Sequence, residues 1–277
     1  MKQSIIFFGL GDFVIPVVER LKNYNLLLVV TGEQEGALID FCKEKNIDFI
    51  SSNLQDEKSI DKIKSLNPTV SVLASFGAIV PNEIINLFPN GIVNIHPSLL
   101  PKYKGPSPVQ FAILNGETIT GVTLIKLDSE IDHGPILLQK PYNLSGNENS
   151  QELLNILFEI GAEMVEELVM KLENGKTLEE TPQNHENETW SYRIEKKDGV
   201  INMSSIPDIH KLDQMIRAFY PWPSVWFRTN IKGQEKLIKL LPEGKIHVEG
   251  KSPMNYKDFI NGFGGEGKEI LEKLNLI

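Results

Sequence analysis

Five short apolar runs separated by helix-like segments dominate the first third of this chain, and they constrain its fold more than any other feature. The runs are residues 4–8, 26–30, 47–50, 69–74 and 91–95. Apolar residues recur with helical spacing between them, at 12–22, 35–45 and 56–65. Strands that alternate with helices of this length are typical of βαβ units, whose consecutive strands lie parallel. The sequence therefore predicts an α/β fold with a Rossmann-like, mostly parallel sheet.

A strand pair and a long helix are expected to close this first domain. The pair covers residues 120–127 and 135–142, and the helix covers residues 150–172, where the apolar residues fall on one side. We place the domain at residues 1–176. A polar segment without periodicity follows, and it predicts a linker over residues 177–195.

The last part of the chain, residues 196–277, is expected to form a small second domain. A helix is predicted at 207–219, followed by three short β-like pieces at 225–228, 236–241 and 245–248. Glycine-bearing turns separate these pieces. With so few residues, the expected architecture is a small, partly open, OB-like β-barrel.

Charge and cysteine content restrict the cellular setting. The net charge is −9, although residues 193–277 carry a small excess of Lys and Arg, which permits a nucleic acid partner without requiring one. The single cysteine, Cys42, cannot form an internal disulfide, which favours a reducing compartment. No apolar run approaches the ~18 residues needed to cross a bilayer, and no signal-peptide pattern precedes the first strand. We therefore expect a cytoplasmic protein with no membrane contact.

The residues that carry chemistry follow the fifth run. Asn94 and His96 are two apart, so on an extended strand both side chains point to the same face. An amide and an imidazole side by side can both donate toward an oxygen that becomes negative during acyl transfer. Taken alone, an Asn-X-His pair more often has a structural role than a catalytic one. Asp132, which stands 36 residues after His96, favours the catalytic role because a carboxylate can orient the imidazole.

The loop over residues 97–108 contains four prolines in twelve residues, a density that suits a loop holding a ligand in a fixed position. Its Ser98 lacks the glycine elbow of a serine hydrolase. His96, Asp132 and His133 lack the spacing of a zinc site, so we predict no metal. Near the N-terminus, Gly9-Leu10-Gly11 fails the dinucleotide fingerprint because Val14 stands where a small residue is needed, yet such a turn can still receive an anion.

The run from Asn94 to Pro108, followed by Asp132, closely resembles the signature of the folate-dependent formyltransferases. Residues 75–81 look like the family's folate-loop segment, and residues 8–17 resemble its first strand and turn. Residues 194–201, 216–223 and 253–262 resemble the C-terminal domain of the branch that formylates initiator methionyl-tRNA.

The resemblance implies a reaction and a set of roles. The formyl group of 10-formyltetrahydrofolate would pass to the α-amine of methionyl initiator tRNA. Separately, we expect a monomer and no metal. Asn94 and His96 would bind the oxyanion, and Asp132 would orient His96 and assist removal of the amine proton. The folate site would be formed by Phe76, Gly77, Ala78, Ile79, Ser98, Leu99, Leu100, Pro101 and Asp128.

Three features depart from the family pattern. Residues 31–37 read TGEQEGA, where the tRNA-specific branch carries a basic insertion. Glu130 replaces a common glycine before Asp132, and the C-terminal unit is shorter than usual. The acidic segment keeps open an alternative acceptor, an amino group on a nucleotide-linked sugar. A non-catalytic folate or nucleotide binder is disfavoured, because Asn94, His96 and Asp132 are all present.

Overall fold

The computed structural model describes residues 2–277, and the chain divides into two compact units. The first unit comprises Met1–Gly105, Ile119–Asn143 and Leu154–Trp190. The second comprises Pro106–Thr118, Leu144–Leu153 and Ser191–Ile277.

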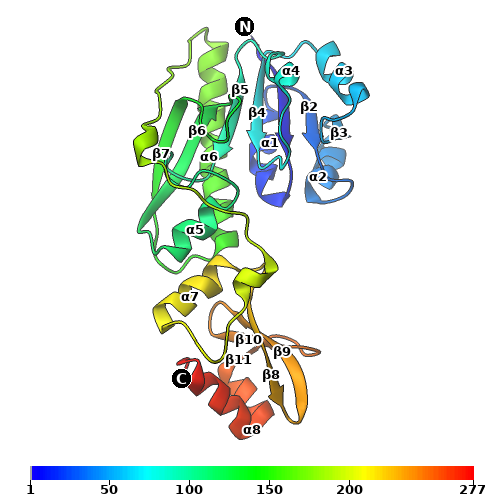
Figure 1. Cartoon of the computed structure of the whole chain (residues 1–277). Coiled ribbons are helices and arrows are strands. Elements are labelled where there is room, and N and C mark those ends of the chain that lie inside the picture. The colour runs from blue at the N-terminus through cyan, green and yellow to red at the C-terminus, as the bar shows by residue number, and fades with distance from the viewer. Residues whose placement is uncertain (1) are drawn as a thin grey trace. The chain divides into compact units, whose positions relative to one another are not determined.

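A seven-stranded sheet forms the first unit (Figure 1). Its strands are β1 (Ser4–Gly9), β2 (Asn25–Thr31), β3 (Phe49–Ser51), β4 (Val70–Ala74), β5 (Ile92–His96), β6 (Ile119–Lys126) and β7 (Ile136–Asn143). Their order is β3-β2-β1-β4-β5-β6-β7; the first five are parallel, and β6 and β7 run antiparallel. The predicted Rossmann-like, mostly parallel sheet is confirmed.

Helices cover both faces of this sheet. They are the short turn η1 (Asp12–Val14) and the helices α1 (Ile15–Leu21), α2 (Ala37–Lys45), α3 (Glu57–Ser65), α4 (Asn82–Ile85) and α6 (Ser150–Glu173). The prediction lacked α4, which is a single turn of four residues, too short for a periodic pattern.

The two faces of β5 have different neighbours. Gly161 of α6 lies so close to Ile95 that a Cβ added there would be 2.7 Å from Ile95 Cγ2. Ile92 points to the other face, where it joins an apolar core that includes Ile63 of α3 and Ile84 of α4. Because side chains alternate along a strand, Asn94 and His96 share the face of Ile92. The long helix therefore supports β5 from behind, and the polar pair faces the opposite side.

The second unit contains α5 (Pro108–Leu114), α7 (Ile209–Ala218), a small sheet and the helix α8 (Tyr256–Lys273). The sheet consists of β8 (Val225–Ile231), β9 (Gln234–Leu241), β10 (Lys245–Val248) and β11 (Met254–Asn255). It is antiparallel, in the order β11-β10-β9-β8. The predicted OB-like barrel is not confirmed, because these strands form an open four-stranded sheet and β11 has only two residues.

Neither α5 nor α8 was predicted from the sequence. The side chains of Phe259, Phe263 and Leu271 on helix α8 are buried. They provide apolar contacts that, in a closed barrel, would come from further strands. Four glycines between residues 262 and 267 conceal its periodicity, and the helix is interrupted at Gly264, whose φ is 63°. Helix α5 starts at Pro108, the last proline of the predicted loop, because proline is favoured in the first turn of a helix.

The segment predicted as a linker packs against the first unit over part of its length. Thr181 and Ile136 exchange two main-chain hydrogen bonds of 2.8 and 2.9 Å. Further along, the Lys104 amide donates to the Thr189 carbonyl at 2.9 Å. Between them lies the short 3₁₀ turn η2 (His185–Asn187). Residues 181–190 are therefore anchored to two loops of the first unit.

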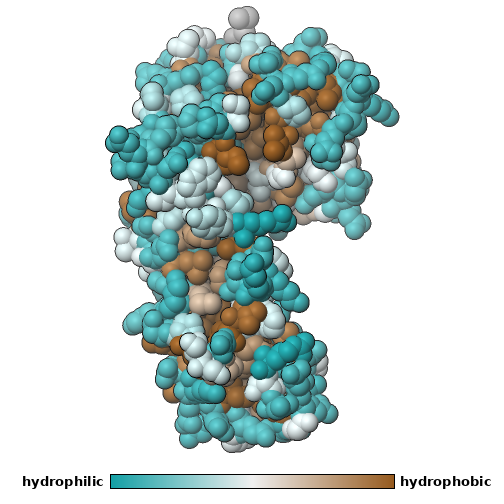
Figure 2. All heavy atoms as spheres, viewed as in Figure 1, coloured by the Kyte–Doolittle hydropathy of each residue, from teal (hydrophilic) through white to brown (hydrophobic). Residues whose placement is uncertain are grey.

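The surface drawn in Figure 2 is mostly hydrophilic, and apolar residues form separate groups on it. Within residues 2–277, none of the helices combines the length and the apolar content needed to cross a bilayer.

Candidate active site

Asn94, His96 and Asp132 lie together on one face of β5. Asn94 and His96 are buried, with 7% and 4% of their surface exposed. Asp132 comes from the β6–β7 connection, residues 127–135, which we call the Asp132 loop. Its Oδ1 accepts a hydrogen bond from Asn94 Nδ2 at 3.2 Å, and its Oδ2 accepts one from the Gly105 amide at 2.8 Å. The three side chains predicted from separate parts of the sequence thus meet at one point.

The two ring nitrogens of His96 have different partners. Nε2 donates to the main-chain carbonyl oxygen of Tyr103 at 2.9 Å, since a carbonyl can only accept. Nδ1 lies 3.5 Å from Asp132 Oδ1. The Tyr103 carbonyl therefore assigns a proton to Nε2, and the other nitrogen faces the carboxylate.

This arrangement provides a hydrogen-bond donor and a proton acceptor side by side. The Asn94 amide group carries two hydrogens, of which Asp132 takes one, and we find no acceptor for the second among residues 2–277. The Asp132 carboxylate, held by two donors, can accept a proton from a nucleophile beside it. A donor fixed in a buried site stabilises a developing negative charge more strongly than it would in water.

Several interactions shape the Asp132 loop. Asp132 adopts a left-handed backbone conformation with φ of 47°. Gly134 passes so close to β6 that an added Cβ would lie 1.8 Å from the Lys126 carbonyl oxygen, so only glycine fits there. Gln183 Nε2 donates to the carbonyl oxygens of Asp132 and Gly134 at 2.9 and 2.8 Å.

Asp128 and Glu130 belong to the same loop but do not contact the three central side chains. Asp128 Oδ2 lies 2.7 Å from His133 Nδ1, and its Oδ1 accepts from the Glu130 amide at 2.9 Å. The His133 ring stacks on the His185 ring, with centroids 4.2 Å apart and planes 4° apart. In this structure Asp128 orders the turn of its own loop.

Apart from Asp128, the residues predicted to bind folate fall into two groups. Leu99, Leu100 and Pro101 line a cavity of about 540 Å³. The other residues that line it are Lys102, Ile119, Thr120, Gln139 and Asn187. Ser98 is fully buried, and its Oγ donates to the Lys102 carbonyl at 2.6 Å. A cavity of this size is within the range of small-molecule sites.

The second group is the loop after β4. The Phe76 side chain is buried in the core, where its ring lies 5.5 Å from that of Phe8 in an edge-on contact. Gly77 has a φ of 74°, and Ile79 is 91% exposed. Phe76 therefore anchors the loop, Ala78 packs partly against the same core, and Gly77 and the apolar Ile79 side chain are exposed.

The glycine turn after β1 holds one of the chain's own carboxylates. Gly11 has a φ of 90°, and its amide donates to Glu33 Oε1 at 3.1 Å. Glu33 follows β2, in the acidic segment at residues 31–37. The anion that this turn can receive is therefore Glu33 in this structure, which leaves less room for a dinucleotide phosphate.

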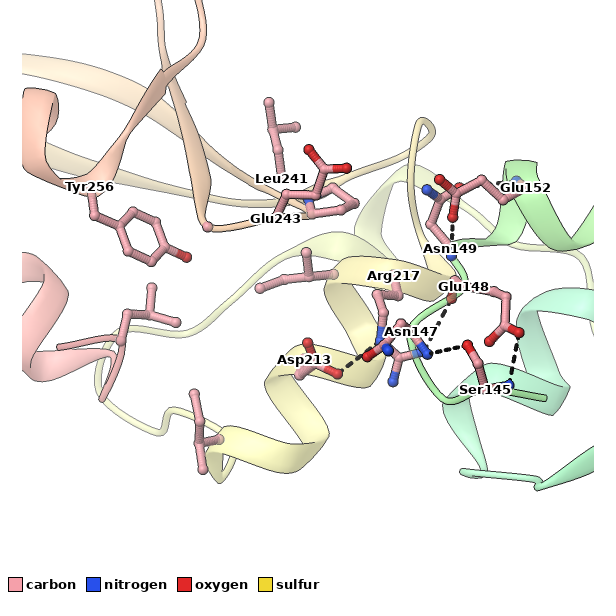
Figure 3. Close-up of a pocket in the computed structure, with 15 residues that line it drawn as sticks. Ser145, Asn147, Glu148, Asn149, Glu152, Asp213, Arg217, Leu241, Glu243 and Tyr256 are labelled. Atoms are coloured by element: carbon pink, nitrogen blue, oxygen red, sulfur yellow. Dashed lines mark hydrogen bonds and ion pairs between the residues drawn. The ribbon is translucent and has the colours of Figure 1, made fainter.

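A second cavity, of about 610 Å³, lies within the second unit (Figure 3). Arg217 is its central side chain. Arg217 Nε lies 2.8 Å from Asp213 Oδ2, and its guanidinium also donates to the Glu148 carbonyl at 3.2 Å. Glu148 in turn accepts from the amides of Ser145 and Gly146, and these hydrogen bonds outweigh its burial and lower the pKa of its carboxyl. The polar groups around Arg217 thus bind one another.

Sequence reasoning missed the main-chain partners of the central side chains and the glutamine behind them. The Tyr103 carbonyl and the Gly105 amide are main-chain groups, so the residue types at these positions do not indicate their role. Gln183 stands in a polar segment where burial is not expected, and a proline before it is its only local signal. Within the part of the chain that the structure describes, no cluster of three or more His, Cys, Asp or Glu residues is placed to hold a metal ion.

The fold and the central side chains define a formyl transferase. The sequence model of the formyl transferase family matches residues 22–169, and the chain belongs to this family. Its relatives narrow the class. A methionyl-tRNA formyltransferase from Thermodesulfovibrio yellowstonii is 33% identical over an alignment of 301 positions, which includes gaps. The alignment covers 95% of this chain and 96% of that protein. One from Chloroflexus aurantiacus is 39% identical over 98% of this chain and 88% of its own length. The resemblance drawn from the sequence motifs is confirmed.

Solved structures share the fold at lower identity. A sugar 3N-formyl transferase, WlaRD, determined in the presence of dTDP and 5-N-formyl-THF, matches with a TM-score of 0.62 and 23% identity. The match covers 91% of this chain and 100% of that one. At this identity the likeness shows the fold alone.

Proposed function

We propose that this chain transfers the formyl group of 10-formyltetrahydrofolate to the α-amine of methionyl initiator tRNA. The observation that carries the proposal is the match of almost the whole chain to methionyl-tRNA formyltransferases, at 33% and 39% identity. The small basic excess in residues 193–277 is compatible with a polyanionic substrate.

The residues that would receive the folate fit such a ligand. A pterin needs an apolar surface for its rings and polar groups at its edge. Leu99, Leu100 and Pro101 border a cavity, and Ile79 offers an exposed apolar side chain. Bound there, the donor supplies an activated formyl group.

The central side chains have complementary roles in the transfer. The amine attacks the formyl carbon, a bond from carbon to the amine nitrogen forms, and the bond from carbon to the folate N10 breaks. Asn94 donates its second N–H to the formyl oxygen while negative charge develops on it. His96 adds a second donor when its Nε2–H turns from the Tyr103 carbonyl to that oxygen. The Asp132 carboxylate accepts the proton that leaves the amine and passes it to N10, so that tetrahydrofolate is released and the carboxylate is restored.

A second acceptor is favoured by one specific observation. The segment after β2 is acidic, and Glu33 and Glu35 would repel phosphates that approach it. An amino group on a nucleotide-linked sugar is smaller than a tRNA and need not pass this segment. The same central side chains would formylate it by the same chemistry.

One experiment distinguishes the two acceptors. The purified protein is incubated with 10-formyltetrahydrofolate and with either methionylated initiator tRNA or an amino-sugar nucleotide, and the formylated products are measured. Uncharged initiator tRNA serves as a control, since it lacks the amine. We expect formylmethionyl-tRNA and no formylated sugar. Formylation of the sugar alone would overturn the proposal.

A further inference from the structure

We propose that Gln183 is a positioning residue of the formyl-transfer site, because it holds the Asp132 loop in the conformation that brings the Asp132 carboxylate to Asn94 and His96. This inference rests on the proposed function and deepens it. Gln183 touches neither substrate in this scheme and acts through Asp132.

The contacts of Gln183 are concentrated on this loop. Its Nε2 donates one hydrogen bond to the Asp132 carbonyl at 2.9 Å and another to the Gly134 carbonyl at 2.8 Å. Both hydrogens of the amide group are therefore used on carbonyls that flank His133. A single side chain thus fixes the backbone on both sides of the turn.

The loop needs such a fixed point. Asp132 has a φ of 47°, a conformation that is uncommon for residues other than glycine. Its carboxylate must satisfy two donors at once, Asn94 Nδ2 at 3.2 Å and the Gly105 amide at 2.8 Å. A small shift of the Asp132 backbone would break these contacts, because hydrogen bonds weaken steeply with distance and angle.

The chemistry of the side chain also indicates positioning. Glutamine supplies two N–H donors from one nitrogen, and the opposite orientation would set Oε1 against two carbonyl oxygens. Gln183 is 7% exposed, and its Oε1 is buried without a hydrogen-bond partner among residues 2–277. An unpaired buried oxygen lowers stability. Maximum stability therefore does not explain a glutamine here, whereas its two donors do.

Contacts of the residues on either side of Gln183 hold it beside the Asp132 loop. Thr181 is joined to Ile136, directly after the loop, by two main-chain hydrogen bonds. Two residues beyond Gln183, the His185 ring stacks on His133. Residues 181–185 thus follow the loop on both sides of the glutamine.

The first test measures kinetics in the full-length protein. Gln183→Leu keeps a side chain of similar size but removes both donors. We expect kcat for formyl transfer to fall by roughly 10- to 100-fold, because small misplacements of catalytic groups have effects of this order, while KM for both substrates stays within about 2-fold. The exposed Gln234→Leu is the matched control and should retain wild-type kcat. Wild-type kcat in Gln183→Leu would overturn the proposal.

Gln183→Glu adds a signature that loss of packing would not produce. When ionised, its carboxylate would face two carbonyl oxygens, so activity at alkaline pH should be at least as low as in Gln183→Leu. Protonation of the glutamate restores one donor. Burial beside two carbonyl oxygens raises the pKa of this glutamate above its ordinary value of ~4.3, so the activity of Gln183→Glu relative to wild type should rise as the pH is lowered from the alkaline range. A ratio that is independent of pH would contradict the proposal.

A structural measurement separates this proposal from the proposed function. Amide hydrogen exchange of Gln183→Leu should be faster than wild type in residues 127–135 and unchanged in β1 and β4. Unchanged exchange in the loop overturns the positioning role, whatever the activity. A wild-type protein that formylates neither acceptor overturns the proposed function, while the exchange result still decides whether Gln183 holds the loop.

Discussion

His96 donates its Nε2–H to the carbonyl oxygen of Tyr103 at 2.9 Å, so the proline-rich loop that follows β5 orients the imidazole at the end of that strand. The same loop supplies the Gly105 amide to Asp132 at 2.8 Å. One loop therefore positions both the ring and the carboxylate, which explains why its conformational freedom is restricted by four prolines.

Replacement of His96 by alanine should reduce kcat by about 10²- to 10³-fold, because the oxyanion loses one donor and the Asp132 carboxylate loses its neighbour. Steady-state formylation of methionylated initiator tRNA is the measurement. Donor binding, followed by the change in protein fluorescence, should stay close to wild type. His210, exposed on α7, is the control for His→Ala. A fully active His96→Ala would exclude the ring from the mechanism.

Asp132→Asn should lower kcat by roughly 10²- to 10⁴-fold, the range associated with loss of a general base. The amide cannot accept a proton, and one of its two ends would meet the Gly105 amide or the Asn94 amide as a donor facing a donor. Asp128→Asn is the comparison within the same loop. Because Asp128 contacts His133 and the Glu130 amide, its loss should change kcat far less. Equal losses in the two variants would contradict the roles given to them.

The strands of the first unit were predictable because each is an apolar run bounded by turn residues. The predicted run at 91–95 became β5 (Ile92–His96), and its two-residue period correctly placed Asn94 and His96 on one face. Asp132 was assigned to this pair because a carboxylate can orient an imidazole, and the family resemblance supported the assignment. Spacing alone could not have done so, since a separation of 36 residues says nothing about contact.

The rest of the site was hidden for physical reasons. Tyr103 and Gly105 contribute main-chain groups, which every residue type has. Gln183 is buried by the tertiary structure although its sequence neighbours are polar. In the second unit, the glycines of α8 obscured a helix whose buried side chains pack in the place of further strands. Local patterns indicate elements, while these features arise only when distant segments meet.

Gly134→Ala should both destabilise the protein and reduce activity. The added methyl group would lie 1.8 Å from the Lys126 carbonyl oxygen, a backbone atom that cannot move aside without shifting β6. We expect a loss of about 1–3 kcal/mol in the free energy of unfolding, measured with urea, because overpacking has effects of this size. Gly265→Ala is the control, since nothing lies within 4 Å of its added Cβ. A Gly134→Ala variant as stable as wild type and Gly265→Ala would show that the Asp132 loop tolerates a larger residue.

Cys42 should be unreactive in the native protein. Its side chain is fully buried in α2, and burial raises the pKa of its thiol from 9.0 to about 11. At pH 8 a thiol reagent such as Ellman's reagent should label it only after urea unfolding, because the thiolate is the nucleophile. Since the unfolded chain loses the thiol proton first, the free energy of unfolding should fall as the pH rises from 9.0 to about 11. Cys42→Ala should lose less stability than wild type over this pH range. Rapid labelling of the native protein at pH 8 would show instead that α2 opens readily.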